Sequence, residues 1–324
     1  MLTILDMQLS ALEKKWKKLL KKITFVTSSL ILFILSFDIL TENRFWVNIG
    51  EEKMKIAAHK VIVFNRCPKL REYEKEGEIF FGDVSLPALS HLLLYLYSDT
   101  TPTQELEKDQ FVELLNLSIK LELTRLKSIC EWHRNLLVLG DQEVAIEKSR
   151  FHVDFEKCVD NQEFSDITFQ LENGDKVNAH RIILVTRSEY FKAGLLGYLS
   201  EKESRVFHLK GEFSKASLIH CLSFMYTGVS PVAKEKLHPD TVIEIIQMAH
   251  LFNLHDLVET LGFWLADFAD SESAAFLFQV GDLYNCESLK KGVKQFVMTH
   301  VKSVKESESF SLLSEEQKEE IQNF

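Results

Sequence analysis

Two histidines, His59 and His180, are the residues of this chain whose type and placement come nearest to chemistry. Each follows an alanine and precedes a lysine or arginine, so each is a candidate metal ligand or general base. A metal site needs several converging ligands, and the eleven histidines form no His-x-x-x-His or His-Glu-x-x-His pair. We therefore interpret both as structural histidines that cap the start of a helix, and we expect no metal and no cofactor.

Patterns for nucleophilic catalysis and phosphate binding are also missing. The five cysteines lie far apart, at Cys67, Cys130, Cys158, Cys221 and Cys286, so there is no Cys-x-x-Cys motif. Such a set is typical of a reducing compartment, where cysteine acts as a small buried apolar residue. The chain has no Gly-x-Ser-x-Gly elbow. Gly194 and Gly197 are not followed by the Lys-Ser/Thr of a phosphate loop. We expect that the protein is not an enzyme and that it acts by binding other proteins through its surfaces.

The composition is that of a packed protein with room for two or three domains. Hydrophobic residues make up 46% and charged residues 27% of the 324 residues. The net charge of −10 argues against nucleic-acid binding, which needs a basic face to neutralise phosphates. We expect no nucleic-acid partner, although lysines cluster near the N-terminus.

Residues 1–36 combine a basic amphipathic helix with an apolar segment. From Leu9 to Ile23 apolar residues recur at helical spacing, and residues 23–37 carry no charge until Asp38. As a helix, these fifteen residues would reach about 22 Å, short of a hydrocarbon core of about 30 Å. We favour an element packed on the following domain or a non-native extension over a signal anchor in a membrane.

The histidines belong to a pattern that occurs twice, which indicates two copies of one fold. The second copy contains Phe-Ser-Asp-Ile (164–167), Ala-His-Arg (179–181), Arg-Ser-Glu-Tyr-Phe (187–191) and Tyr-Thr-Gly (226–228). The first copy contains Asp-Ile (38–39), Ala-His-Lys (58–60) and Tyr-Ser-Asp (97–99). Within the second copy we predict a hairpin of residues 168–171 and 176–178 around Asn173-Gly174. We also predict helices at 190–196 and 214–226 and a strand at 206–209.

These motifs resemble the BTB/POZ family, strongly in the second copy and loosely in the first, which has Asn-Arg-Cys-Pro (65–68) in place of Arg-Ser-x-Tyr-Phe. The resemblance implies an α+β fold, with a helix cluster flanked by a small sheet in each copy. It places the first BTB domain at 37–135, a linker at 136–150 and the second BTB domain at 151–269. Residues 270–324 resemble the start of an all-α BACK domain, because residues 252–257 are echoed 32 residues later.

Charged residues near the histidines have two interpretations. Asp166 with Arg181, and Asp38 with Lys60, either form ion pairs that fix strand against helix or line a groove at a BTB dimer interface. The resemblance supplies the groove, and we favour the ion pairs.

The resemblance also implies a partner. BTB proteins with a BACK-like extension recruit substrates to Cullin-3 ubiquitin ligases, and the family's cullin contacts match Leu199, Glu201 and Phe252. The first copy is eight residues shorter where this motif belongs, so we expect it not to bind cullin. The alternative is an oligomerising scaffold or transcription-linked regulator that uses BTB pairing alone, within one chain or between chains. We expect the protein to be located in the cytoplasm or nucleus and to recruit an unidentified protein substrate.

Overall fold

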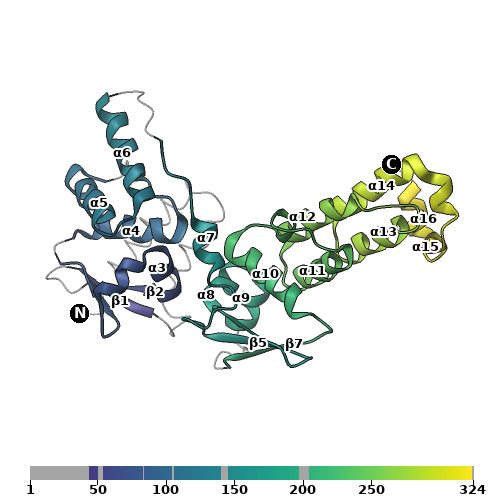
Figure 1. The fold of residues 1–324 in the computed structure, drawn as a ribbon, viewed down its shortest axis with the longest axis horizontal. Coiled ribbons are helices and arrows are strands. Elements are labelled where there is room, and N and C mark those ends of the chain that lie inside the picture. The colour runs from purple at the N-terminus through teal and green to yellow at the C-terminus, as the bar shows by residue number, and fades with distance from the viewer. Residues whose placement is uncertain are drawn as a thin grey trace, which may run out of the picture. The chain divides into compact units, whose positions relative to one another are not determined.

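The computed structural model describes residues 44–49, 54–82, 84–103, 106–139, 145–196 and 204–322 (Figure 1). The chain divides into two compact units, each described here by itself. The first runs to Asp166 and includes His180–Ile182; the second contains Ile167–Ala179 and the chain from Ile183 onward.

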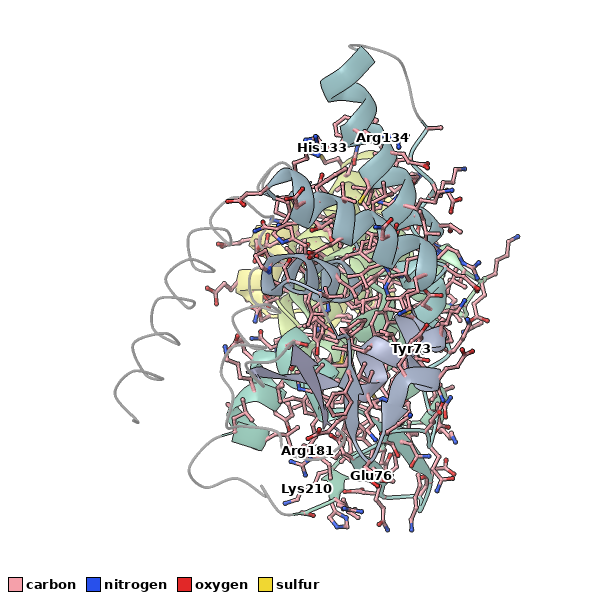
Figure 2. All side chains as sticks on the ribbon, turned by 90° about the vertical axis from the view of Figure 1, so that its left-hand side faces the viewer. Tyr73, Glu76, His133, Arg134, Arg181 and Lys210 are labelled. Atoms are coloured by element: carbon pink, nitrogen blue, oxygen red, sulfur yellow. The ribbon has the colours of Figure 1, made fainter. Side chains whose placement is uncertain are left out.

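The first unit is a helix cluster with a small sheet. Its elements are β1 (Arg44–Ile49), β2 (Met54–His59), α3 (Lys60–Arg66), the 3-10 helix η1 (Pro68–Tyr73), β3 (Glu74–Lys75), β4 (Glu78–Phe80), α4 (Leu86–Ser98), α5 (Lys108–Lys120), α6 (Thr124–Leu139) and α7 (Phe151–Glu156). The strand order is β2-β1-β4-β3, with β1 and β4 parallel. The helices bury Val63, Leu92 and Leu126 in a shared core. Glu76 marks the sheet end of the unit and His133 lies on α6 at the opposite end (Figure 2).

The second unit repeats this plan and adds further helices. Its elements are β5 (Ile167–Leu171), β6 (Lys176–Ala179), α8 (Arg181–Arg187), α9 (Glu189–Leu196), β7 (Val206–Leu209), α10 (Lys215–Thr227), the 3-10 helix η3 (Pro231–Ala233), α11 (Pro239–Leu251), α12 (His255–Ala266), α13 (Ala274–Leu283), α14 (Glu287–Lys305), α15 (Glu308–Ser311) and α16 (Glu315–Gln322). Its strand order is β6-β5-β7, with β5 and β7 parallel. The predicted helix clusters flanked by small sheets are thereby confirmed.

The predicted hairpin forms around Asn173 and Gly174. Gly174 has φ +90°, a backbone conformation that favours glycine. The side-chain oxygen of Asn173 accepts a hydrogen bond from the amide of Asp175 at 3.0 Å. This local chemistry fixes the turn, and the turn fixes the register in which β6 brings Ala179 opposite Ile167.

Matching helix starts show that the two units are copies of one design. Ser85 caps α4 and Ser214 caps α10, each by accepting a bond from a backbone amide. The backbone amide of Ser85 also donates to Glu113 at 2.9 Å, and that of Ser214 donates to Glu244 at 2.5 Å. In both copies a glutamate of the next helix therefore holds the start of the preceding one.

The strand register corrects the placement of the first copy. In the second copy the residue after Asp166 faces the alanine that precedes the helix histidine. In the first copy the residue facing the corresponding alanine is Phe45. Arg44, and not Asp38, therefore takes the position of Asp166, so the prediction that Asp38 opens the first strand is wrong. Asp38 itself lies outside the described residues.

The 32-residue echo corresponds to a repeated helix–turn–helix geometry. Asn253 between α11 and α12 has φ 56°, and Asn285 between α13 and α14 has φ 52°. After each asparagine the next amide donates to the carbonyl five residues earlier, at 2.8 and 2.7 Å. This is the hydrogen bond of a Schellman turn, whose left-handed position tolerates asparagine.

None of the described helices is both long and apolar enough to span a membrane. The apolar run of residues 23–37 lies outside the described part of the chain.

Candidate partner-binding groove of the second copy

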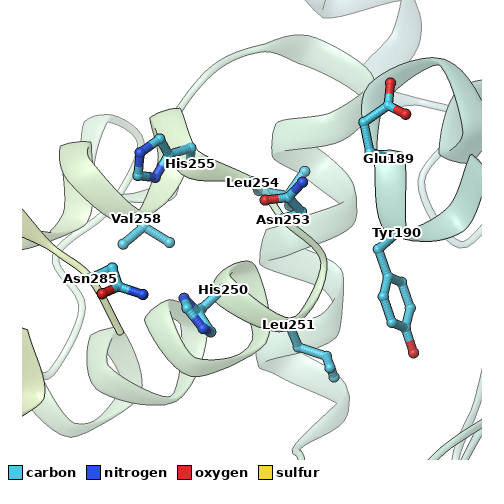
Figure 3. Close-up of a pocket in the computed structure, with 9 residues that line it drawn as sticks. All are labelled: Glu189, Tyr190, His250, Leu251, Asn253, Leu254, His255, Val258 and Asn285. Atoms are coloured by element: carbon cyan, nitrogen blue, oxygen red, sulfur yellow. The ribbon is translucent and has the colours of Figure 1, made fainter. Parts of the chain in front are cut away.

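A cavity of about 500 Å³ opens on the second unit where α9 meets the turns of the following helix pairs (Figure 3). Its lining consists of Glu189, Tyr190, His250, Leu251, Asn253, Leu254, His255, Val258 and Asn285. Figure 3 shows Glu189 and Tyr190 on one wall and His255 and Asn285 on the opposite one. We call this cavity the α9–α12 groove.

Tyr190 forms the apolar wall of the groove and is supported from behind by buried aromatic rings. Its own ring is 37% exposed and lies 5.9 Å from the ring of Phe252 and 5.2 Å from that of Phe191. Phe191 and Phe252 are fully buried and 4.7 Å apart, centroid to centroid. Partial burial also raises the pKa of the Tyr190 hydroxyl. A half-exposed tyrosine on a rigid aromatic base is a suitable anchor for a protein partner.

The burial of Phe252 corrects its predicted role. We predicted that Phe252 contacts cullin, but its side chain has no exposed surface. Its carbonyl oxygen accepts a hydrogen bond of 2.6 Å from the Ser188 hydroxyl, which in turn accepts one from the amide of Phe191. Phe252 therefore fixes α9 against the α11–α12 turn and positions Tyr190, and the surface is provided by Tyr190.

The opposite wall is polar. His250, His255, Asn253 and Asn285 are exposed. The Nδ1 atom of His250 lies 3.0 Å from the carbonyl oxygen of Tyr284, so this hydrogen bond joins the two helix pairs across the groove floor. Hydrogen-bonding groups that face a tyrosine can orient a bound peptide segment.

The predicted cullin residues Leu199 and Glu201 lie outside the described residues. The helix α9 ends at Leu196, and description resumes at Ser204 before β7. The role of this motif stays a prediction.

The two helix histidines are buried and differ in their partners. The Nδ1 atom of His59 lies 2.8 Å from the Tyr97 hydroxyl, and no side-chain bond from His59 caps α3. The Nε2 atom of His180 lies 2.9 Å from the carbonyl oxygen of Glu163. Burial lowers the pKa of His180, which keeps its ring neutral. Both histidines hold distant segments together, which fits the predicted structural role, whereas the predicted side-chain cap does not form at His59.

The charged residues beside them act partly through the backbone. The Asp166 carboxylate accepts a 2.7 Å bond from the backbone amide of Arg181, at the first residue of α8. The Arg181 Nε atom lies 3.4 Å from the Asp166 carbonyl oxygen, at the long end of a hydrogen bond. Lys60 pairs with Glu74 at 3.1 Å within the first unit. The Asp166 carboxylate therefore satisfies a backbone amide at the start of α8.

Metal and thiol chemistry have no support among the described residues. Within that part of the chain no three histidine, cysteine or acidic side chains are placed to hold a metal ion. All five cysteines are free and buried. Burial raises the pKa of Cys67 to about 11 and those of Cys130 and Cys158 to about 12. Such thiols are not nucleophiles at neutral pH.

Sequence reasoning quoted Tyr190 as part of a motif but did not assign it to the site. The available signal was its position directly before Phe191 at the start of a short helix. The structure shows that Tyr190 is exposed there and that Phe191 is buried. Asn253 and Asn285 also had a signal, since each follows an apolar helical stripe at the same point of the repeat.

The family model for the BTB/POZ domain matches residues 46–135 and 155–268, which is more than half of the chain. BTB/POZ domain-containing protein 9 of Drosophila melanogaster is 27% identical over 172 residues, covering 53% of this chain and 23% of that protein. Human Kelch repeat and BTB domain-containing protein 2 is 27% identical over 155 residues (48% and 24%), and human Kelch-like protein 6 is 26% identical over 154 residues (47% and 22%). The chain thus spans about a quarter of the length of these relatives. With matches on both copies, the chain belongs to the BTB/POZ domain family, and it contains the domain twice.

Proposed function

We propose that the protein is a non-catalytic adaptor whose second BTB domain binds Cullin-3 and so brings a protein substrate to a ubiquitin ligase. Family membership supports protein–protein interaction as the activity. The carrying observation is the α9–α12 groove, which presents the half-exposed Tyr190 on a buried aromatic base. The predicted Leu199 and Glu201 motif follows α9, the helix that carries Tyr190, by only a few residues.

The remaining parts of the proposal concern the other regions of the chain. We assign α13–α16 to a partial BACK-like extension, on the basis of the repeated turn. Pairing of BTB domains, within a chain or between chains, belongs to the same proposal, and so does a location in the cytoplasm or nucleus. Five buried, free cysteines support a reducing compartment.

The groove is tested with a charge placed on its apolar wall. We would measure binding of the full chain to immobilised Cullin-3 N-terminal domain, comparing wild type with Tyr190→Arg. Loss of a buried aromatic anchor commonly costs about 2 kcal/mol or more, roughly a thirtyfold weaker Kd. Phe80→Arg is the matched control, because Phe80 is an exposed aromatic residue on β4 of the first copy. Equal weakening by both variants, or by neither, would contradict the groove as the binding site.

A further inference from the structure

Arg66 at the end of α3 is a buried cation held by carboxylates from two different parts of the chain. Its side chain is 3% exposed. One terminal nitrogen pairs with Asp99, which follows α4, and the other donates to Asp154 of α7 at 2.7 Å. The guanidinium also lies 5.4 Å from the ring centre of Tyr95 and 5.1 Å from that of Phe151. Phe151 and Asp154 both belong to the chain after the first copy.

Comparison with the second copy explains why the first copy needs this outside carboxylate. The matching residue, Arg187 at the end of α8, donates to the carbonyl oxygen of Met225 at 3.1 Å and has Asp256, the second residue of α12, as its acidic neighbour. The second residue of α6 in the first copy is Arg125, a cation in place of that acid.

Arg125 shares the Asp99 carboxylate with Arg66. Its Nε atom donates to Asp99 at 2.8 Å, while Arg66 pairs with the other oxygen of the same group. Two cations thus meet one anion within the first copy. Asp154 supplies a second anion to Arg66, and the exposed Lys157 of the same segment lies 4.0 Å from the other Asp154 oxygen. A buried charge such as that of Arg66 is strongly unfavourable when it is left without its partner.

Residues 145–164, which follow the first copy and which we call the connector, make a second set of contacts at the start of α6. The Glu147 carboxylate accepts a 2.6 Å bond from the Thr124 hydroxyl, and its backbone amide donates to the Ser128 hydroxyl at 3.1 Å. The Glu147 carbonyl oxygen accepts a bond from Arg125. Glu147 thus contacts three side chains in the first two turns of α6.

A third set holds the far end of the connector. Glu163 pairs with Arg71 of η1. The Phe164 ring lies 5.8 Å from that of Phe64, and the Arg71 guanidinium lies 5.3 Å from the centre of the Phe164 ring. Three acidic and two aromatic residues of the connector therefore contact the first copy over a run of eighteen residues, 147–164.

We propose that the first BTB copy carries a binding site for an aromatic–acidic peptide segment, centred on Arg66, and that the chain's own connector 145–164 occupies this site. The ligand is defined by its chemistry. Phe151 stacks on the guanidinium and Asp154, three residues later on the same face of α7, neutralises it. The connector is thus a bound ligand of the first domain and not a spacer.

Hydrogen exchange on the full chain tests whether Asp154 holds the connector. In the Asp154→Asn variant the amides of residues 151–158 should exchange about tenfold faster or more, because this segment opens locally, while α4 keeps its protection. Asp109→Asn is the matched control, since it removes an exposed carboxylate on α5. Unchanged exchange at 151–158 would overturn the proposal. A parallel loss of protection in α4 would overturn it as well, because α7 would then be an inseparable part of the core.

A labelled peptide of residues 147–164 tests the site itself. It should bind the Asp154→Asn chain at least about tenfold more tightly than wild type, whose site is filled. Peptides carrying Phe151→Ala or Asp154→Asn should lose this binding. A peptide that binds neither chain, or binds equally with and without Phe151 and Asp154, would contradict a site of this chemistry.

Discussion

The close contact of α12 with α14 at Gly262 gives the sharpest stability prediction. A Cβ atom at this position would lie 2.0 Å from the Cys286 sulfur and 3.1 Å from the Leu289 Cβ. Normal carbon contacts begin at about 3.5 Å, so Gly262→Ala requires the two helices to separate. Cys286 directly follows Asn285 of the groove, and therefore this separation also disturbs the groove floor.

The magnitude follows from two opposing terms. Overpacking a closed core contact costs typically about 1–3 kcal/mol. Replacing glycine by alanine inside a helix contributes up to about 1 kcal/mol in the other direction. A contact of 2.0 Å places the overpacking cost in the upper part of its range, about 2–3 kcal/mol, so we expect Gly262→Ala to lower the free energy of unfolding by about 1–2 kcal/mol.

Urea unfolding followed by circular dichroism measures this change, and Gly194→Ala is the control. Gly194 lies within α9, is exposed, and a Cβ there meets no atom within 4 Å. The control should therefore raise stability by about 0.5–1 kcal/mol, the opposite sign for the same chemical change. A Gly262→Ala variant as stable as wild type, or stabilised like the control, would refute the close packing of α12 on α14.

Two further predictions concern buried titratable groups. Because burial lowers the pKa of His180, the unfolded chain takes up a proton that the folded chain refuses. Stability contributed by the neutral ring is therefore lost as pH falls below its ordinary value of about 6.5, by at most about 1.4 kcal/mol per pH unit. His180→Gln should flatten this slope in urea titrations between pH 7.5 and 5.5, and an unchanged slope would contradict the assignment. Because burial raises the pKa of each cysteine thiol, the native protein should react slowly with a disulfide reagent, and five thiols should react in guanidinium. Rapid stoichiometric reaction of the native protein would show that the thiols are accessible.

Local features of the fold could be predicted from the sequence because their causes are local. Asn173-Gly174 supplies the backbone conformation of its own turn, and Ser214 caps the helix that directly follows it. Asn253 and Asn285 repeat because each ends a helix of the same kind. In these cases the residues that decide the structure are sequence neighbours.

Features that depend on distant residues could not be predicted in this way. Phe252 was predicted as a contact residue, but its burial is decided by Phe191, 61 positions earlier in the chain. The first strand was aligned on Asp38, and this alignment was wrong because a single aspartate is a weak marker. The register is set by the pairing of β1 with β2. Residues 136–150 were expected to be a linker and Asp154 to belong to the second BTB domain, since nothing local shows that Asp154 meets Arg66 across 88 positions.

The most direct test of the adaptor proposal is calorimetry of the full chain with the N-terminal domain of Cullin-3. The full chain is used because residues up to Asp166 belong to the first unit. We expect sub-micromolar binding, about −8 kcal/mol or stronger. The double variant Leu199→Asp with Glu201→Ala should abolish it while the circular dichroism spectrum stays unchanged. A folded wild-type protein that gives no heat of binding would contradict the proposal and leave a BTB-paired scaffold as the function.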